Sequence, residues 1–351
     1  MYFNWKDSID ENELNIVSQS IKNGEIVIMP TETVYGIGAN LFDEEAVKKI
    51  FIAKNRPQDN PLIVHIGSKS EIEMVAQTPN AIEQALIDAF MPGPFTIILK
   101  KKDCIPDIVS AGLDTIGVRM PSNEIANRII LSVGNPIVLP SANISGRPSG
   151  TRIEDIREEL EPKVYAIVDG GESKIGLEST VVKVIDNVPV ILRPGKITPA
   201  DIEKVVGSCQ IDKNVFVQPE KVVDAETPGS KFEHYVSKIE CNLIAGNDNS
   251  KIIEKINSII KEKDGKVALI AFDDITDRID ISKDRLFSIK KSDSIEKNSE
   301  EYAEKIYRYI REAEKTDSVL VLIQAVKEEG LGIAIMNRLL RTSSFKIIKV
   351  D

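Results

Sequence analysis

EIVIMPTETVYGIGANLFDEEAVKKIFIAK, residues 25–54, indicates the fold class of the chain. Glu25–Met29 is a short β-branched run that Pro30 stops, and this pattern predicts a strand. A polar turn, Thr31–Gly38, follows it, and Glu44–Ala53 then places apolar residues at helical spacing. The stretch therefore predicts a strand, a polar turn at its carboxyl end and a helix, which is a unit of α/β domains.

The same alternation continues on both sides of this stretch. Helices are predicted at Glu11–Asn23, Ser70–Gln77, Ala81–Phe90, Glu124–Leu131 and Ile153–Leu160. Strands are predicted at Leu62–Ile66, Phe95–Leu99, Thr115–Arg119, Pro136–Leu139, Ala166–Val168, Ser179–Val184 and Val190–Leu192. Mixed strands and helices of this kind predict a single α/β domain over residues 1–206.

Residues 207–239 have a different character, since they are irregular and show no sustained period. We interpret them as a linker, because such long irregular segments are uncommon inside a compact domain. Strand and helix patterns return over residues 240–351. Strands are predicted at Asn242–Ala245, Val267–Phe272 and Val319–Ile323, and helices at Asn249–Glu262, Ser299–Glu314 and Gly332–Leu340. This alternation predicts a small Rossmann-like C-terminal domain with a parallel sheet.

Composition excludes several classes of protein. The net charge is −10, most of it carried by residues 1–220, which argues against strong direct nucleic-acid binding. No apolar run approaches the roughly 18 residues of a membrane helix, and residues 1–12 show no readable signal peptide. The 3 cysteines lie far apart and only 2 histidines exist, so neither a zinc site nor a polyhistidine metal centre is expected. We expect a cytoplasmic protein without membrane segments.

The common nucleotide and hydrolase motifs are missing. The chain has no GxxxxGK[ST] phosphate loop and no GxSxG nucleophile elbow. Gly36-Ile37-Gly38 begins like a dinucleotide-binding motif, but the third glycine is replaced by Leu41.

Polar clusters instead follow the ends of predicted strands, where ligands bind in open α/β sheets. Four cations stand in these clusters in an otherwise acidic region: Lys54, Arg56, Arg119 and Arg193. They suit a polyanion such as a nucleoside triphosphate, or a carboxylate held by a planar guanidinium. Short hydroxyls and amides accompany them at Thr31, Thr33, Ser141, Asn143, Ser149, Ser179 and Thr180. With no evident nucleophile or histidine base, catalysis would rest on positioning and charge stabilisation.

Each of these residues also has a purely structural interpretation. A lone Ser or Thr more often satisfies a cap or turn. Lys54 and Arg56 also fit a solvated helix end, favoured there by the helix dipole. His65 also fits a core histidine with its hydrogen bonds made, and Glu32 and Glu178 also fit caps of helices or turns. The functional interpretation depends on the whole set gathering at strand ends.

Taken together, the polar segments resemble the threonylcarbamoyl-AMP synthase family with its YrdC-type domain. The matching stretches are PTETVYGIGAN (30–40), AKNRPQDNPLIVHI (53–66), MPGPFTIIL (91–99), GVRMP (117–121), PSANISGRPSGT (140–151), DGGESKIGLESTVV (169–182) and ILRPG (191–195). TPGSKFEHY (227–235) and EEGLGIAIMNRLLR (328–341) resemble the linker and the C-terminal domain of its long, two-domain form.

The resemblance implies a YrdC-like twisted mixed sheet with helices around a large crevice. It also implies a nucleotidyltransferase that forms threonylcarbamoyl-AMP and pyrophosphate from L-threonine, bicarbonate and ATP, with Mg²⁺ accompanying ATP. The product would pass to the tRNA threonylcarbamoyl-transferase complex, for threonylcarbamoyladenosine modification of tRNA.

Position by position, the resemblance also implies site residues. Those for threonine are Thr33, His65, Arg119, Leu139 and Ser179. Those for the nucleotide are Lys54, Arg56, Asn60, Thr115, Ser141, Asn143, Ser149, Arg193 and Tyr235. Lys54 and Arg56 would be catalytic, Tyr235 would lie on a lid that excludes water, and no protein metal site is implied.

The chain departs from the family pattern in places. The linker residues expected as methionine, tyrosine, arginine, alanine and proline are here Ser230, Phe232, Glu233, Val236 and Ser237. Asn123 stands where many relatives have histidine, and Met29 where many have tyrosine. Two other functions stay open at this point. One is a non-catalytic RNA-binding protein of the same fold, which the acidic charge disfavours. The other is a carbamoyl transferase of the hydrogenase-maturation kind, whose zinc fingers three scattered cysteines cannot supply.

Overall fold

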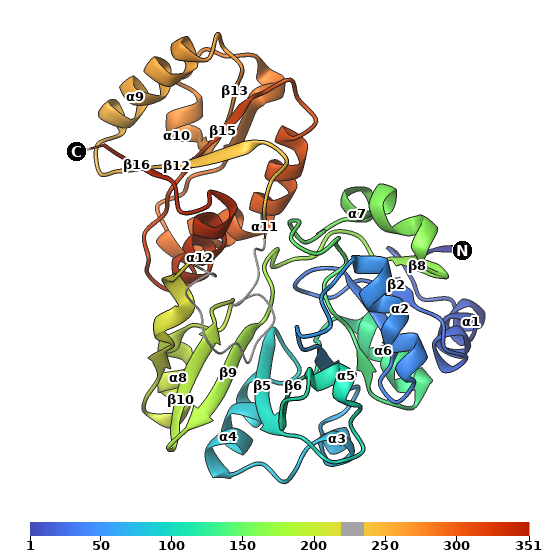
Figure 1. Cartoon of the computed structure of the whole chain (residues 1–351). Helices are drawn as coiled ribbons and strands as arrows, with labels where there is room; N and C mark the ends of the chain where they lie inside the picture. The colour runs from blue at the N-terminus through green and yellow to red at the C-terminus, as the bar shows by residue number, and fades with distance from the viewer. Residues whose placement is uncertain (219–234, 351) are drawn as a thin grey trace. The chain divides into compact units, whose positions relative to one another are not determined.

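The computed structural model describes residues 1–218 and 235–350 of the chain. It divides into two compact units (Figure 1). Unit 1 comprises Met1–Ser145 and Ser149–Phe232, and unit 2 comprises Gly146–Pro148 and Glu233–Asp351. Gly146–Pro148, which lie within the stretch PSANISGRPSGT (140–151), therefore belong to unit 2. The residues before and after them, Ser145 and Ser149, belong to unit 1.

Unit 1 is built on a mixed sheet of 11 strands in the order β1-β8-β2-β3-β7-β4-β6-β5-β9-β10-β11. The strands are β1 Tyr2–Asn4, β2 Val27–Met29, β3 Gly36–Asn40, β4 Ile63–His65, β5 Phe95–Lys100, β6 Thr115–Arg119, β7 Ile137–Val138, β8 Ala166–Asp169, β9 Thr180–Ile185, β10 Val188–Arg193 and β11 Gln210–Ile211. The helices are α1 Glu11–Lys22, α2 Glu44–Lys54, α3 Ile72–Val75, α4 Ala81–Phe90, α5 Asp107–Ser110, α6 Glu124–Val133, α7 Ile153–Leu160 and α8 Pro199–Val206. The predicted mixed α/β fold is confirmed.

Caps and apolar spacing explain where the helices lie. The Asp10 side chain accepts from the amides of Asn12 and Glu13, so α1 begins at Glu11, and Leu14, Val17 and Ile21 bury its inner face. Asp43 caps α2 in the same way. Asn123, which departs from the family pattern, caps α6 by accepting from the amide of Ala126.

Some predicted elements were wrong in extent or kind. The predicted turn Thr31–Gly38 contains the start of β3, which pairs antiparallel with β2. The predicted helix Ser70–Gln77 is a short 3-10 turn followed by the single turn of α3. Within the predicted linker, Gln210–Ile211 pairs with β10 as β11. These short pieces gain their hydrogen bonds from distant partners, which local periodicity does not register.

The sheet places the predicted site residues at neighbouring strand ends. β4 and β6 run parallel, and His65 and Arg119 are register partners at their last residues. β5 and β9 also run parallel, which places Thr96 opposite Val181 and close to Ser179. An isolated bridge joins Gly36 to Ser141. Strand ends that are far apart in sequence therefore meet along one edge of the sheet.

Unit 2 contains a five-stranded sheet in the order β14-β13-β15-β12-β16, and every pair in it is parallel. Its strands are β12 Glu240–Gly246, β13 Val267–Phe272, β14 Leu286–Ile289, β15 Leu320–Gln324 and β16 Ile347–Val350. Its helices are α9 Asn249–Glu262, α10 Asp273–Thr276, α11 Ile295–Ala313 and α12 Gly332–Thr342. The predicted parallel sheet is confirmed, while β14 and β16 were not predicted.

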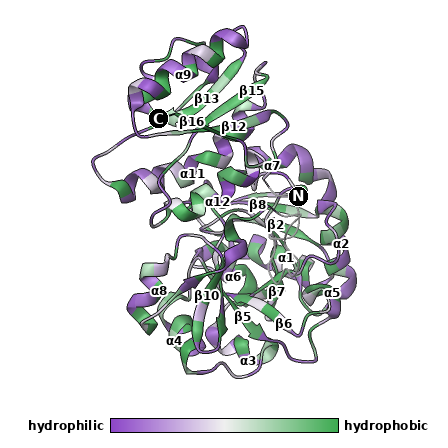
Figure 2. Cartoon of the chain, turned by 60° about the vertical axis from the view of Figure 1, so that its left-hand side comes forward, coloured by the Kyte–Doolittle hydropathy of each residue, from purple (hydrophilic) through white to green (hydrophobic). Residues whose placement is uncertain are grey.

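Hydropathy follows this architecture closely. In Figure 2 the strands β13 and β15 are hydrophobic along their length, and all residues of both strands are buried. α9 shows both hydrophobic and hydrophilic residues, and its buried side chains are Ile252, Ile253, Ile256 and Ile259. Central strands of a parallel sheet are covered on both faces, which explains the continuous apolar runs in the sequence. Among the described residues, no helix is long and apolar enough to cross a membrane.

Candidate active site

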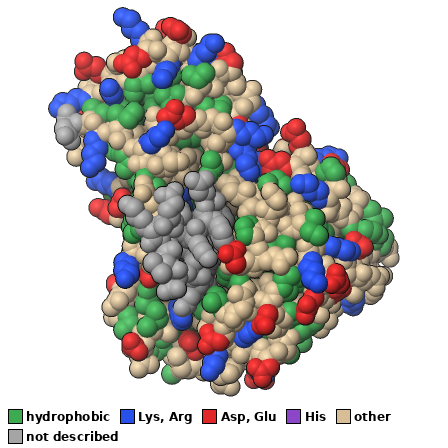
Figure 3. All heavy atoms as spheres, viewed as in Figure 1, with side chains coloured by type: hydrophobic (Ala, Val, Ile, Leu, Met, Phe, Trp, Pro, Cys, Tyr) green, Lys and Arg blue, Asp and Glu red, His purple; other side chains and the backbone are tan. Residues whose placement is uncertain are grey.

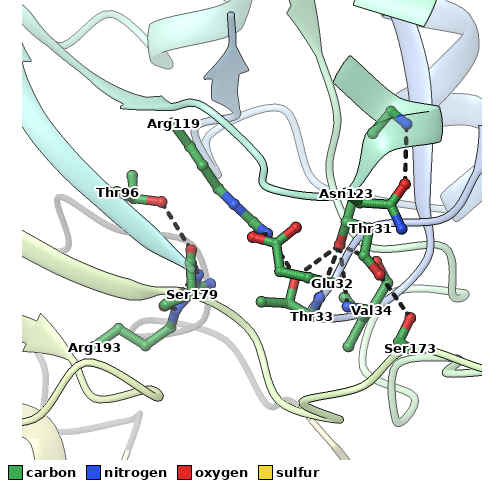
Figure 4. A network of polar contacts seen from close by, with 11 residues as sticks. Thr31, Glu32, Thr33, Val34, Thr96, Arg119, Asn123, Ser173, Ser179 and Arg193 are labelled. Atoms are coloured by element: carbon green, nitrogen blue, oxygen red, sulfur yellow. Dashed lines mark hydrogen bonds and ion pairs between the residues drawn. The ribbon is translucent and has the colours of Figure 1, made fainter. Parts of the chain in front are cut away.

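A buried ion pair lies at the centre of the candidate site in unit 1 (Figure 4). The Arg119 guanidinium, at the end of β6, donates to Glu32 Oε1 over 2.7 Å and to Thr33 Oγ1 over 2.9 Å. Thr31 and Thr33 share a hydrogen bond of 2.8 Å, and Thr31 also donates to the Val34 carbonyl. The turn after β2 is thereby tied to the end of β6. Glu32 does not cap a helix or turn, so that structural interpretation was wrong.

Three buried polar atoms in this part of the site have no hydrogen-bond partner among the described residues. They are Arg119 Nε, Glu32 Oε2 and His65 Nε2. Buried polar groups are nearly always hydrogen-bonded, so unpaired ones of opposite character indicate room for a ligand that completes them. Arg119 Nε offers a donor and Glu32 Oε2 an acceptor, which matches the carboxylate and ammonium groups of an amino acid.

His65 is 2% exposed, and its Nδ1 lies 3.2 Å from the carbonyl oxygen of Ile63. Burial, together with the nearby positive charge of Arg119, lowers the pKa of His65 well below its ordinary value. The ring is therefore neutral near pH 7. If Nδ1 donates to Ile63, Nε2 is left as a hydrogen-bond acceptor facing the site.

Ser179 and Arg193 form a second cluster beside the first (Figure 4). The guanidinium of Arg193 donates to the Ser179 carbonyl through Nε and Nη2, and Nη2 also reaches Ser179 Oγ over 3.0 Å. Thr96 Oγ1 lies 2.8 Å from Ser179 Oγ. A Cβ added to Gly195 would lie 2.5 Å from the Thr180 amide nitrogen and 2.7 Å from the Glu178 carbonyl oxygen. Only glycine allows these two chain segments to approach this closely.

Arg56 folds back over the loop that follows α2. Its Nε and Nη2 donate to the carbonyl oxygen of Asn60 and its Nη2 also donates to that of Pro61, over 2.9 Å to 3.3 Å. The Asn60 side-chain nitrogen is buried and has no partner in the described part of the chain. Burial and the nearby Arg193 lower the pKa of Arg56. Arg56 and Arg193 therefore lie within electrostatic range of each other.

Lys54 is 1% exposed and belongs to the last turn of α2. Its ammonium donates to the Ser141 carbonyl and, over 2.8 Å, to the Asn143 carbonyl. Ser141 Oγ in turn donates to Asn143 Oδ1 over 2.6 Å. Burial and then the charge of Arg56 lower the pKa of Lys54 well below its ordinary value. In this structure Lys54 thus holds the loop after β7, rather than extending as a solvated helix end.

The remaining predicted residues of unit 1 are placed as follows. Ser149 donates to Glu178 Oε1 over 2.6 Å, so Glu178 is drawn into the site instead of acting only as a cap. The Leu139 amide donates to the Ile63 carbonyl beside His65, which puts the Leu139 backbone next to the threonine-type cluster. Thr115 begins β6, at the opposite end of the strand from Arg119 and roughly 13 Å along it.

The cations influence one another's pKa values and therefore belong to one electropositive region. The charge of Arg56 lowers the pKa of Lys54, and the charge of Arg193 lowers that of Arg56. The charges of Arg119 and Arg193 both lower the pKa of His65. Like charges gathered in a buried region are costly unless an anion completes it. The arrangement therefore favours a ligand with several negative charges next to a smaller amino-acid-like cluster.

Tyr235 belongs to unit 2 and is 5% exposed. Its ring stacks on Tyr307 with centroids 5.4 Å apart, and the guanidinium of Arg338 lies over it at 5.4 Å. The lid role of Tyr235 stays a prediction. His234 and the altered linker residues Ser230, Phe232 and Glu233 lie outside the described residues. The altered residue Ser237 is described, and its hydroxyl donates to Glu314 over 2.9 Å.

The segment Gly146–Pro148 is tightly bound within unit 2. Arg147 forms a two-pronged ion pair with Glu314, the C-cap residue of α11, and donates to the Val236 carbonyl over 3.1 Å. Arg311 donates to the Pro148 carbonyl through two nitrogens, and the Val236 amide donates to Gly146. The residues on either side of this segment include Asn143 and Ser149 of the candidate nucleotide cluster.

Residues 1–218 and 235–350 hold no group of three or more His, Cys, Asp or Glu placed to bind a metal ion. Sequence reasoning also missed two residues that contact the predicted ones: Glu32 as the partner of Arg119, and Thr96 as the partner of Ser179. The position of Glu32 in the polar turn that follows a strand was a usable signal. Thr96 lies inside the otherwise apolar strand β5, so the sequence carries no signal that it belongs to the site.

Known proteins are similar to this chain over nearly its whole length. A family model described as Telomere recombination matches residues 19–195, and one described as the C-terminal domain of threonylcarbamoyl-AMP synthase matches residues 197–344. A threonylcarbamoyl-AMP synthase from Pyrococcus abyssi is 40% identical over 350 residues, covering 99% of this chain and 98% of the relative. One from Bacillus subtilis is 35% identical, covering 98% and 97%. The crystal structure of P. abyssi Sua5 complexed with L-threonine matches with a TM-score of 0.91 at 40% identity and covers 100% of both chains.

Proposed function

Since the chain belongs to the threonylcarbamoyl-AMP synthase family in its two-domain form, we propose that it makes threonylcarbamoyl-AMP from L-threonine, bicarbonate and ATP, with release of pyrophosphate. The observation that carries this proposal is the pair of adjoining clusters in unit 1. One offers unpaired donors and acceptors for an amino acid, around Arg119 and Glu32. The other gathers Lys54, Arg56 and Arg193 for a polyanion.

We assign threonine to the first cluster. Its carboxylate would bind the Arg119 guanidinium, including the Nε that lacks a partner, because guanidinium–carboxylate geometry is complementary. Its ammonium would donate to Glu32 Oε2, and the threonine hydroxyl would donate to the neutral His65 Nε2. Thr33 and Ser179 close this cluster on either side, each already oriented by a hydrogen bond to an arginine.

The reaction then needs two bonds to form. Threonine binds as an ammonium, so its nitrogen must first lose a proton, and Glu32 Oε2 is the proposed acceptor. The neutral nitrogen then bonds to the carbon of bicarbonate with loss of water, giving a carbamate. A carbamate oxygen next bonds to the α-phosphorus of ATP while the bond from that phosphorus to the β-bridging oxygen breaks, and pyrophosphate leaves. Because the described chain supplies no evident nucleophile, its contribution is to hold the reactants in line and to stabilise charge.

The cations of the second cluster would stabilise the phosphates. Arg56 and Arg193 are proposed to contact the triphosphate directly, with the Asn60 side-chain nitrogen as a further donor. Lys54 is proposed to act through the loop that it holds, by fixing Ser141 and Asn143 for the nucleotide. Mg²⁺ would enter with ATP and screen its charge, and Ser149 with Glu178 offers the oxygen ligands that Mg²⁺ prefers.

The RNA-binding alternative gains no support. On the face shown in Figure 3, lysines and arginines are interspersed with acidic side chains instead of forming one basic patch. The cytoplasmic location and the transfer of product to the tRNA-modifying complex stay predictions.

Pyrophosphate release from ATP, measured with and without threonine and bicarbonate, tests the proposal. We expect release to require both co-substrates and to fall sharply in Arg56→Ala, with Arg128→Ala as the control because that arginine is a surface residue of α6. Release that is independent of threonine would contradict the proposal.

A further inference from the structure

Unit 2 contains a cavity of about 510 Å³ that the proposed reaction does not use. It is lined by the carboxyl ends of β12, β13 and β15 and by the first turn of α11, including Gly246, Asn247, Phe272, Ile295 and Gln324. Its volume lies within the range of pockets that bind small molecules, roughly 300–1,000 Å³.

The cavity lies at the position in the sheet where ligands generally bind. β12 and β15 are neighbours, but the chain leaves β12 through α9 toward β13 on one side, and leaves β15 through α12 toward β16 on the other. Such a reversal of direction opens a crevice between the two carboxyl ends, and open α/β sheets bind their ligands in that crevice. Residues on both strand ends line the cavity here: Ala245, Gly246, Gln324 and Ala325.

The charge of the lining indicates an anion. Lys291, Lys327 and Lys349 line the cavity, and its lining contains no acidic residue. Lys291 pairs with Asp274, whereas Lys327 and Lys349 form no ion pair within the described residues. The first amide groups of α11, at Ile295 and Glu296, lack partners within the helix and add positive potential. Two lysines not engaged in ion pairs match the double negative charge of a phosphate monoester.

The remaining surface of the cavity suits a planar ring. Phe272, Ile295 and Val326 provide apolar contact, while Asn247 and Gln324 contribute amide groups. Gln324 Oε1 already accepts from the Phe272 amide, which fixes the orientation of the side chain and leaves its NH₂ group to meet a ligand. Aromatic contact with a few placed amides is how pockets recognise a nucleobase.

We propose that this cavity binds a nucleoside monophosphate, with the phosphate between Lys327, Lys349 and the start of α11 and the base against Phe272. The site is separate from the catalytic clusters of unit 1. It gives the C-terminal unit a ligand-binding role that does not depend on the reaction proposed above.

A reporter inside the cavity tests this proposal in the full chain. Ile295 is 60% exposed and lines the cavity, so Ile295→Trp adds a tryptophan there to the one natural tryptophan, Trp5, which is buried in unit 1. AMP is the probe, and we expect a saturable change in the emission of this variant. Adenosine, without phosphate, is expected to bind at least about tenfold more weakly.

Variants in the reporter background separate the two nucleotide sites. Lys327→Glu with Lys349→Glu is expected to weaken the AMP response at least about tenfold, because both are exposed and their reversal repels phosphate. Arg56→Ala and the surface change Lys255→Glu are expected to leave it unaltered. No response to AMP, a response lost in Arg56→Ala, or one unchanged by the double lysine reversal would each overturn the proposal. A chain that releases no pyrophosphate would contradict the proposed reaction but would still give each of these AMP-binding results.

Discussion

Arg119 and Glu32 form a buried ion pair of 2.7 Å between residues that are 87 positions apart in the chain, with 6% and 10% of their side chains exposed. The pair leaves Arg119 Nε and Glu32 Oε2 without partners among the described residues. Buried polar atoms without hydrogen-bond partners are energetically costly, so the ion pair favours binding of a ligand that supplies the missing partners. This relationship explains how an amino acid with both charges would be recognised.

Arg119→Lys tests the threonine site. A lysine keeps the charge but cannot present two parallel donors, so we expect the KM for threonine to rise roughly 30-fold, or about 2 kcal/mol, with little change in the KM for ATP. Steady-state pyrophosphate release with each substrate varied in turn measures both constants. Equal effects on the two constants would contradict the separate assignment of the clusters.

His65 predicts a pH dependence of stability. Because its pKa is lowered in the folded state, the unfolded chain binds the proton more readily once the pH falls below about 6.5. The free energy of unfolding should therefore decrease with falling pH, by at most about 1.4 kcal/mol per pH unit from this group. Denaturant unfolding from neutral pH to about pH 5 should show a smaller decrease in His65→Asn. An identical decrease in both proteins would exclude this role.

Gly195→Ala tests the close approach of the segment after β10 to Ser179. The added Cβ would meet main-chain atoms of Glu178, Ser179 and Thr180, which cannot move away as a flexible side chain can. We expect a loss of about 1–3 kcal/mol in stability and a large loss of activity, because Ser179 is displaced. Gly112→Ala is the control, since nothing lies within 4 Å of its Cβ and its positive φ alone should cost about 1 kcal/mol. Comparable activity loss in the control would argue against the steric explanation.

Lys54→Met distinguishes a positioning residue from a phosphate ligand. Removing the ammonium leaves the buried carbonyls of Ser141 and Asn143 without their donor, so we expect a stability loss of about 2–3 kcal/mol together with a higher KM for ATP. Lys48→Met, on the exposed side of the same helix, should change neither. Loss of ATP affinity at full stability would instead show a direct contact with phosphate.

Glu314→Ala tests whether unit 2 supports the loop between Asn143 and Ser149. Truncation leaves Arg147 without the carboxylate it pairs with, which is typically costly by about 3–5 kcal/mol when the pair is buried. We expect hydrogen exchange at the amides of Val236 and Lys238, which donate to the Gly146 carbonyl and to Glu314, to accelerate at least about tenfold, and the KM for ATP to rise. Glu296→Ala, in the first turn of α11, is the control. Faster exchange without any kinetic change would limit the pair to a structural role.

Much of the fold could be predicted because its long elements carry strong local patterns. Thr115–Arg119 was predicted with the observed bounds, and α1, α6 and α9 lie within two residues of their predicted ends. β3 was missed because Gly36-Ile37-Gly38 has turn composition, and its strand geometry depends on pairing with β2 and β7. β14 and β16 were missed at the edges of the second sheet, where periodicity is weakest.

The site could be predicted as a set of residues but not as a set of contacts. The α/β fold class predicted that polar residues at strand ends would lie close together. The structure brings Arg119, Thr33 and His65 together there. The partners of each residue could not be predicted, since Glu32 reaches Arg119 and Thr96 reaches Ser179 only through the tertiary fold. The charge of Lys54 indicated a phosphate ligand, but its burial against two carbonyls depends on a loop 87 residues further along the chain.

The most direct test of the account is transfer of labelled carbon from bicarbonate into a product that contains both threonine and AMP. We predict that the full chain forms this product with ATP, that Arg56→Ala loses it at any threonine concentration, and that Arg119→Lys regains it at high threonine concentration. Formation of pyrophosphate without labelled product, or rescue of Arg56→Ala by threonine, would contradict the central claim that two adjoining clusters in unit 1 hold the two substrates.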